Sequence, residues 1–154
     1  MFGHDSSGLA SLIPGYWDHV GMIVGWSDYY NDWLVVEAEP STGVHVTTFS
    51  TFLTRYETVA IERVAVSDAI KEAAVQFALA QVGKSYNWDF FSKPKVYDDK
   101  YYCSQLVWAA YMAASNGQVN LDPNPSWSWE YGYAVAPTEV YDSNWTYVVY
   151  YNGI

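Results

Sequence analysis

Strand-like and helix-like segments follow one another along this chain in an order that few folds accommodate. Strand patterns come first, up to residue 66, a helical pattern follows at 67–82, a second begins at Cys103, and a strand-like run closes the chain. Strands joined by short turns pair antiparallel, and helices that follow them pack on the sheet. The order therefore predicts an α+β fold, an antiparallel sheet or barrel with helices packed on one face.

Short runs rich in β-branched and aromatic residues predict the strands. The runs lie at 19–26, 33–38, 44–48, 59–66 and 145–151. The first two flank the turn-like stretch SDYYND and predict a β-hairpin. Residues 49–56 are predicted to form a helical turn or a loop, and residues 1–14, at whose end lies the pair Pro14-Gly15, are predicted to be loop.

Two segments carry apolar residues at helical spacing. Ser67 is a predicted N-cap for the first helix, which Gly83 ends. Residues 84–100 are polar and aromatic and predict a long loop. The second helix begins at Cys103, and Asn116-Gly117 ends it. A proline at residue 137 is predicted to open one further helical turn.

Length and charge limit the classes of partner. A chain of 154 residues suits one domain with a single core, so we expect residues 1–154 to form one domain. Seven basic against 17 acidic residues give a net charge of −10, which disfavours phosphate backbones and anionic lipid surfaces. No apolar run has the roughly 18 to 20 residues that cross a bilayer, and no signal peptide is visible. We expect no nucleic-acid partner, no transmembrane segment, and either a cytoplasmic protein or a secreted one without its signal peptide.

Cys103 is the only cysteine of the chain, and it lies in the first turn of a predicted helix. A lone cysteine is often a small buried hydrophobe. The positive end of a helix dipole, however, favours the thiolate, which is the reactive form. The position of Cys103 after a polar loop leaves both interpretations open.

A thiol nucleophile needs a base and a group that orients the base. Of the three histidines, His4 lies in a predicted loop and His45 at the outer position of a short strand, where we expect it to be exposed, whereas His19 opens an apolar strand. Glu37 lies on the strand predicted to pair with that of His19, where a carboxylate needs a partner; Glu39 is the alternative. No ligand types have the close spacing typical of metal sites, so we expect no metal and no cofactor.

Together these residues resemble the permuted NlpC-type papain-like family, which includes YiiX- and YaeF-like hydrolases and is related to lecithin retinol acyltransferase. The likeness runs from Trp17 to about Val149, and three segments carry it: WDHVGMIVG, VVEAEPSTGV and VGKSYNWDFFSKPKVYDDKYYCSQLVWAAY. In unpermuted members a Gly-x-x-Tyr loop leads to Asp-Cys-Ser-Gly at a helix start, and a His-Val-Gly strand comes later. Here HVG at 19–21 precedes both GKSY at 83–86 and the Cys-Ser pair, which is the permuted order.

The resemblance implies roles for individual residues. Cys103 would be the nucleophile, His19 the base and Glu37 the group that orients it. The backbone N–H of Cys103 and the hydroxyl of Tyr86 would lie near the oxyanion, where charge develops in the transition state. The candidate substrate-binding residues are Tyr86, Tyr102, Ser104 and Trp17.

Two departures from the family pattern bear on specificity. Tyr102 and Gln105 replace the Asp and Gly that flank Cys-Ser in the unpermuted motif, which weakens transfer of specificity for cell-wall peptides. Family members usually carry a Gly-Asp strand before the histidine strand, and MFGHDSSGL has no clear equivalent. Met1-Phe2 is a candidate for the end of that strand.

The expected function is that of a cysteine hydrolase, which cleaves an amide, ester or thioester bond in a peptide or acyl-lipid substrate through an acyl-enzyme. The alternatives are an acyltransferase of the lecithin retinol acyltransferase type and a non-catalytic binding module on the same fold. The aromatic-rich stretch WSWEYGY at 127–133 follows a proline-rich loop and is a predicted exposed platform for substrate.

Overall fold

The computed structural model describes residues 1–154 except for 7–12, 90–93, 96–98 and 154. In chain order its elements are β1 (Phe2–His4), β2 (His19–Val20), β3 (Met22–Ser27), β4 (Asp32–Glu39), β5 (Gly43–Thr48), α1 (Phe49–Leu53), β6 (Thr58–Val64), α2 (Asp68–Ala80), β7 (Ser85–Tyr86), β8 (Lys100–Tyr101), α3 (Cys103–Ala114), α4 (Pro137–Tyr141) and β9 (Thr146–Tyr151).

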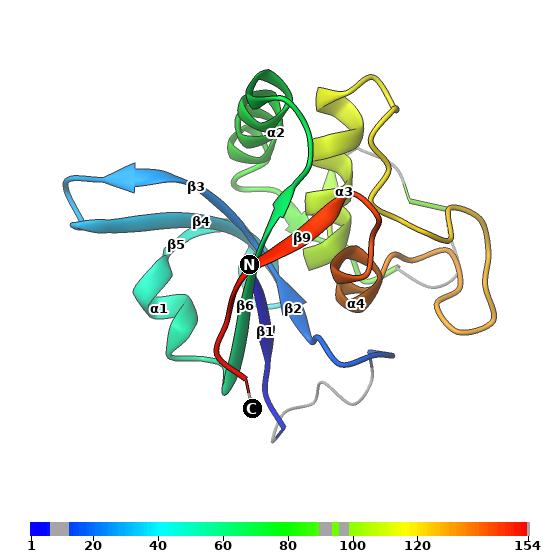
Figure 1. The fold of residues 1–154 in the computed structure, drawn as a ribbon, viewed down its shortest axis with the longest axis horizontal. Coiled ribbons are helices and arrows are strands. Elements are labelled where there is room, and N and C mark those ends of the chain that lie inside the picture. The colour runs from blue at the N-terminus through cyan, green and yellow to red at the C-terminus, as the bar shows by residue number, and fades with distance from the viewer. Residues whose placement is uncertain (7–12, 90–93, 96–98, 154) are drawn as a thin grey trace.

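Antiparallel pairing builds two main sheets that are joined at a bend. The first has the order β2-β1-β6-β9 and the second the order β3-β4-β5. β2 runs on into β3 through Gly21 (Figure 1). A Cβ at Gly21 would lie 2.8 Å from Cγ1 of Val35, so the close approach of the two strands at this bend requires glycine. The bend places His19 in one sheet and the partners of β3 in the other.

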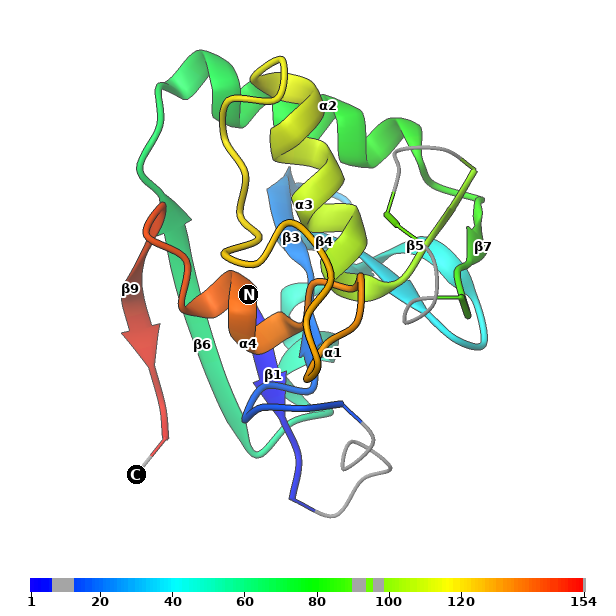
Figure 2. The ribbon, with the colours of Figure 1, turned by 90° about the vertical axis from the view of Figure 1, so that its right-hand side faces the viewer.

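Helices α2, α3 and α4 gather on one side of the sheets (Figures 1 and 2), and α3 packs against α2, β2 and β4. The main core cluster, which contains Leu106 of α3 and Val36 of β4, lies there. On the opposite face Val35 packs with Phe52 of α1. Because successive strand residues face opposite sides, Glu37 lies on the same face as Val35, toward α1.

The loop predicted over residues 1–14 is wrong at Phe2–His4, which form β1 in the interior of a sheet. Phe2 is buried, and a Cβ at Gly3 would lie 2.4 Å from the ring of Tyr56, so the backbone passes directly over that ring. A strand of three residues with a central glycine shows no periodicity, and its partners β2 and β6 are distant in sequence. Residues 7–12 of the predicted loop lie outside the described part of the chain.

The other predicted elements are confirmed within a few residues. The predicted hairpin is present as β3 and β4. The prediction that the strand of His19 pairs with that of Glu37 is wrong, because the chain bends at Gly21 and His19 lies on β2, which pairs with β1. The helix after Ser67 is α2, whose first turn donates from Ile70 N to Ser67 Oγ at 3.3 Å. The predicted loop 84–100 contains the short parallel pair β7 and β8; its residues 90–93 and 96–98 lie outside the described residues. No helix among the described residues is long and apolar enough to cross a membrane.

Candidate active site

The start of α3 is fixed by side chains that surround Cys103. Gln105 is fully buried, and its Oε1 accepts from the backbone N–H of Tyr102 at 3.2 Å and from Nδ2 of Asn87 at 2.9 Å. Cys103 is the first residue of the helix and is 5% exposed. The first backbone N–H groups of a helix have no partner within the helix, so the thiol lies beside donors and the positive end of the dipole. The predicted helix-start position of the cysteine is confirmed.

His19, on β2, joins the thiol to a carboxylate. Its Nε2 lies 2.7 Å from Oε1 of Glu37, and its ring also hydrogen-bonds the Cys103 side chain. A carboxylate can only accept, so Nε2 carries the proton, and Nδ1 is the nitrogen that remains for the thiol. The ring stacks on Phe52 and Tyr56, with centroid separations of 5.7 and 5.8 Å, which holds its plane. The structure therefore brings Cys103, His19 and Glu37 together.

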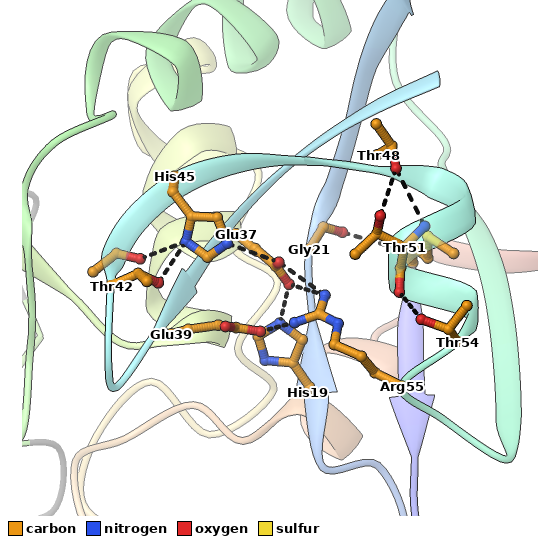
Figure 3. Close-up of polar contacts among 12 residues, drawn as sticks. His19, Gly21, Glu37, Glu39, Thr42, His45, Thr48, Thr51, Thr54 and Arg55 are labelled. Atoms are coloured by element: carbon orange, nitrogen blue, oxygen red, sulfur yellow. Dashed lines mark hydrogen bonds and ion pairs between the residues drawn. The ribbon is translucent and has the colours of Figure 1, made fainter. Parts of the chain in front are cut away.

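Glu37 is fully buried on β4, yet every part of its carboxylate has a partner (Figure 3). Besides His19, Nη2 of Arg55 donates to both oxygens at 2.7 and 2.8 Å, and Nε2 of His45 lies 3.1 Å from Oε2. Nη1 of the same guanidinium pairs with Glu39. A buried carboxylate is tolerated when it is paired in this way.

These contacts favour an ion pair between Cys103 and His19. Burial raises the pKa of the Cys103 thiol, but the hydrogen bond and positive charge of His19 outweigh it, helped by the Val20 N–H, and the net pKa is lowered. Burial lowers the pKa of His19, but Cys103 and Glu37 raise it to about 9. Burial likewise raises the pKa of Glu37, and His19 followed by Arg55 bring it below its ordinary value. The charged forms of all three side chains are stabilised by one another.

A cavity of about 150 Å³ opens beside the thiol. Its lining is mostly apolar and comprises Ile13, Pro14, Tyr86, Tyr102, Cys103, Ser104, Glu130, Tyr131, Ala134, Val135, Ala136 and Pro137. Two neighbours of the cysteine hold the far wall: the Tyr102 hydroxyl accepts from Val135 N at 3.1 Å, and Ser104 Oγ donates to Val135 O at 2.5 Å. Of the candidate substrate-binding residues, Tyr86, Tyr102 and Ser104 thus line this cavity.

The structure does not bring Trp17 to the cavity. Its ring is 3% exposed and packs against Phe2 and Tyr141, at centroid separations of 5.8 and 5.0 Å. An aromatic residue just before a strand packs into the core here, and the arrangement gives no support to substrate binding by Trp17. In the predicted platform, Trp127 and Trp129 are exposed, with ring centroids 4.6 Å apart, and Glu130 and Tyr131 continue into the cavity wall.

His45 is less exposed than expected, and the contact between Arg55 and Glu37 was not predicted. The imidazole of His45 is about a quarter exposed and reaches Glu37 because the two residues are direct cross-strand partners in β4 and β5. Only the register of that pair could have revealed the contact. Arg55 follows α1 and reaches the site through the fold, for which the sequence carries no local signal.

Three side chains of the types that bind metal ions lie close together at the site, although their spacing in the sequence is not one typical of metal sites. One ligand atom each from His19, Glu37 and Glu39 lies within 4.8 Å of the others. The guanidinium of Arg55, however, is bonded to both carboxylates. A metal ion could take this place only if Arg55 moved out of it, so the residues as arranged fit a guanidinium rather than a metal.

Comparison with known proteins gives three similarities. Residues 2–150 match the family described as "Permuted papain-like amidase enzyme, YaeF/YiiX, C92 family". The uncharacterized protein YycO of Bacillus subtilis (strain 168) is 26% identical over 113 residues, which are 73% of this chain and 42% of YycO, so the chain spans less than half of that relative. The crystal structure of "metalloprotein yiiX" from Escherichia coli O157:H7 has a TM-score of 0.73 at 20% identity and covers 100% of this chain and 94% of that one. This last similarity concerns the fold and supports the predicted permuted papain-like architecture.

Proposed function

The chain belongs to the YaeF/YiiX family of permuted papain-like amidases, and on that premise we propose that it cleaves an amide, ester or thioester bond with Cys103 as nucleophile, His19 as base and Glu37 as the orienting group. The observation that carries the proposal is the pair of contacts made by His19. One ring nitrogen faces the thiol, and the other lies 2.7 Å from a fully buried carboxylate. This arrangement gives the base a fixed tautomer beside a thiol at a helix start.

In the first half-reaction the thiol proton is already on Nδ1 of His19, as in the ion pair, and the thiolate sulfur of Cys103 forms a bond to the carbonyl carbon of the substrate. The carbonyl electron pair moves to oxygen and gives a tetrahedral oxyanion. As the bond to the leaving group breaks, the leaving group takes the electron pair and the proton held on Nδ1. The products are a thioester on Cys103 and a free amine, alcohol or thiol.

In the second half-reaction water enters where the leaving group was. Nδ1 of His19 takes a proton from the water as its oxygen bonds to the thioester carbon. The second tetrahedral oxyanion collapses, the C–S bond breaks, and the sulfur leaves as the thiolate, paired again with the imidazolium. The acid product is released and Cys103 is regenerated.

Two groups are our candidates for the donors to the oxyanion. The backbone N–H of Cys103 is one of the N–H groups at the start of α3. Tyr86 lines the same cavity as the thiol, and burial raises the pKa of its phenol, so the hydroxyl keeps its proton at neutral pH. We assign these two groups to the developing negative charge, where preorganised donors lower the barrier most.

The lining of the cavity supports an apolar acyl group. Apart from Glu130 and the thiolate of Cys103, its side chains are uncharged, and most are aromatic or aliphatic. A volume of about 150 Å³ suits a short acyl chain or one peptide side chain next to the scissile carbonyl. The similar E. coli YiiX is named a metalloprotein, but in this chain the guanidinium of Arg55 pairs with both Glu37 and Glu39 and takes the place that a metal ion would need.

Trapping of an acyl group on Cys103 tests the proposal. With p-nitrophenyl butyrate we expect a burst of nitrophenol and a single acyl adduct by mass spectrometry, which neutral hydroxylamine removes because it is a thioester. Cys103→Ala should give neither, while His4→Gln, a change at another histidine, should give both. An equal adduct on Cys103→Ala would refute the proposal.

The same sample separates the alternatives. A binding module with an inert cysteine would alkylate with iodoacetamide at the ordinary thiol pKa, near 8.5. The enzyme should alkylate with a pKa well below that, since His19 favours the thiolate. An acyltransferase would form the same adduct but release it faster when an amine or alcohol acceptor is added.

A further inference from the structure

The carboxylate of Glu37 has more hydrogen-bond and ion-pair partners than the proposed reaction requires. A carboxylate that only oriented His19 would need one hydrogen bond, but Glu37 has three partners, two of them outside the proposed Cys103, His19 and Glu37 (Figure 3). His19 takes Oε1, His45 takes Oε2, and Arg55 bridges both oxygens. With both oxygens engaged on separate elements, the plane of the carboxylate is fixed.

His45 is itself held from its other side. Its Nδ1 lies 2.8 Å from Oγ1 of Thr42, in the turn that joins β4 to β5, and 3.1 Å from the carbonyl oxygen of Gly43, the first residue of β5. Its Nε2 faces a carboxylate and therefore carries a proton. Since Glu37 and His45 are paired in register across the two strands, the contact is built into the sheet rather than made by a flexible side chain.

Arg55 is held in place by two aromatic rings and by two carboxylates. Its guanidinium carbon lies 5.1 Å from the ring centroid of Phe52 and 5.5 Å from that of Tyr56, the two rings on which His19 also stacks. One arm bonds Glu37 and the other bonds Glu39. Glu37 and Glu39 face the same side of β4 because they are two residues apart. Without the guanidinium, the carboxylates of Glu37 and Glu39 would lie within 4.8 Å of each other with no positive charge of Arg55 between them. Like charges at that distance disfavour ionisation of both groups.

We propose that His45 and Arg55 are positioning residues, which hold the Glu37 carboxylate ionised and in the one orientation that directs Oε1 at His19. The inference rests on the proposed function, because it gives these residues a role in the reaction of Cys103. Neither residue lines the cavity beside the thiol. Their effect on the reaction passes through Glu37 and His19.

The test uses the low thiol pKa of Cys103 as its readout, because a purely structural role would not move it. The rate of alkylation by iodoacetamide is measured against pH in the full chain, whose single cysteine makes the adduct unambiguous. In His45→Ala we expect the alkylation pKa to rise toward the ordinary thiol value and kcat on p-nitrophenyl butyrate to fall about tenfold to a hundredfold, with KM little changed. His45→Gln keeps an N–H donor and should restore part of both.

A second set of variants separates the effect of the positive charge of Arg55 from its effect on the position of Glu37. Arg55→Met should lower kcat by at least as much as His45→Ala. Arg55→Met combined with Glu39→Gln should recover part of the loss, because the second carboxylate is neutral in that variant. Circular dichroism establishes that each variant is folded; if Arg55→Met does not fold, the His45 variants decide the matter alone.

His4→Gln is the matched control. His4 is as exposed as His45 and also pairs with a carboxylate, Asp18, at 2.9 Å, but it does not touch Glu37. Its alkylation profile should be that of the wild type. A wild-type profile in His45→Ala would overturn the inference and leave the proposed function standing. An ordinary thiol pKa in the wild type would refute the proposed function itself.

Discussion

Replacement of Glu37 by Gln should weaken the base of the proposed reaction by a calculable amount. The pKa of His19 is raised from 6.5 to about 9, although burial alone lowers it. Cys103 and Glu37 both raise this pKa, each through a hydrogen bond and through its charge. Each effect of Cys103 is followed in size by the same effect of Glu37, so the two residues contribute to a similar extent. Loss of the carboxylate should therefore lower this pKa by at least about 1, which corresponds to ~1.4 kcal/mol.

Two measurements follow from this value. NMR titration of the His19 ring should place its pKa near 8 or below in Glu37→Gln, and the alkaline limb of kcat/KM should move down with it. A pKa raised in the folded state stabilises the fold fully below pH 6.5, and the stabilisation is lost as pH rises through about 9. Relative to the wild type, Glu37→Gln should therefore lose at least ~1.4 kcal/mol of unfolding free energy at pH 6 through the lower pKa of His19. This contribution should vanish above pH 9.

Glu39→Gln is the matched control, because this carboxylate lies on the same face of β4 and pairs with Arg55 but makes no hydrogen bond to His19 in the described contacts. It should change the pKa of His19 less than Glu37→Gln does. The reasoning is refuted if the ring of His19 titrates in Glu37→Gln as it does in the wild type, or at a higher pH.

Three further changes test other parts of the site. Tyr86→Phe should lower kcat by about 10- to 100-fold with the iodoacetamide rate unchanged, because only the oxyanion loses a donor. Ser104→Ala leaves the buried carbonyl of Val135 without its hydroxyl donor and should cost about 1–3 kcal/mol in urea unfolding; a change below 0.5 kcal/mol would argue against the contact. Gly21→Ala places a Cβ 2.8 Å from Val35 and should cost about 1–3 kcal/mol by the same assay, with the alkylation pKa unchanged if the bend does not move His19.

The helix that carries Cys103 could be predicted because its signals are local. Apolar residues at helical spacing and a polar loop before them mark the start of α3 at Cys103, and the structure begins the helix at that residue. The hairpin was predictable for the same reason, since its two runs and the turn between them are contiguous in sequence. The hairpin placed Glu37 correctly on β4, but His19 reaches it from β2 of the other sheet through the bend at Gly21, which the sequence pattern did not predict.

The remaining parts of the fold and site depend on contacts that no local pattern carries. β1 has three residues, and its ladder to β6 joins positions more than fifty residues apart. Whether His45 faced solvent or Glu37 depended on the register of β4 against β5, and a shift of one residue would have reversed it. Arg55 reaches Glu37 only because α1 folds back over β4.

The permuted order of the chain is compatible with the proposed cysteine chemistry, because that chemistry depends on how the three side chains are arranged in space and not on the order of their elements in the chain. Each proposed group is held by its own element: Cys103 by the first turn of α3, His19 by β2 beside the bend at Gly21, and Glu37 by β4. The couplings between them are a thiol–imidazole and an imidazole–carboxylate hydrogen bond, and both depend on distance and burial alone. Any chain order that packs the N-terminus of this helix against these two strands preserves them, provided that the carboxylate remains paired when it is buried. Glu37 meets that last condition through His45 of β5, the next strand in the chain, and through Arg55, which follows α1.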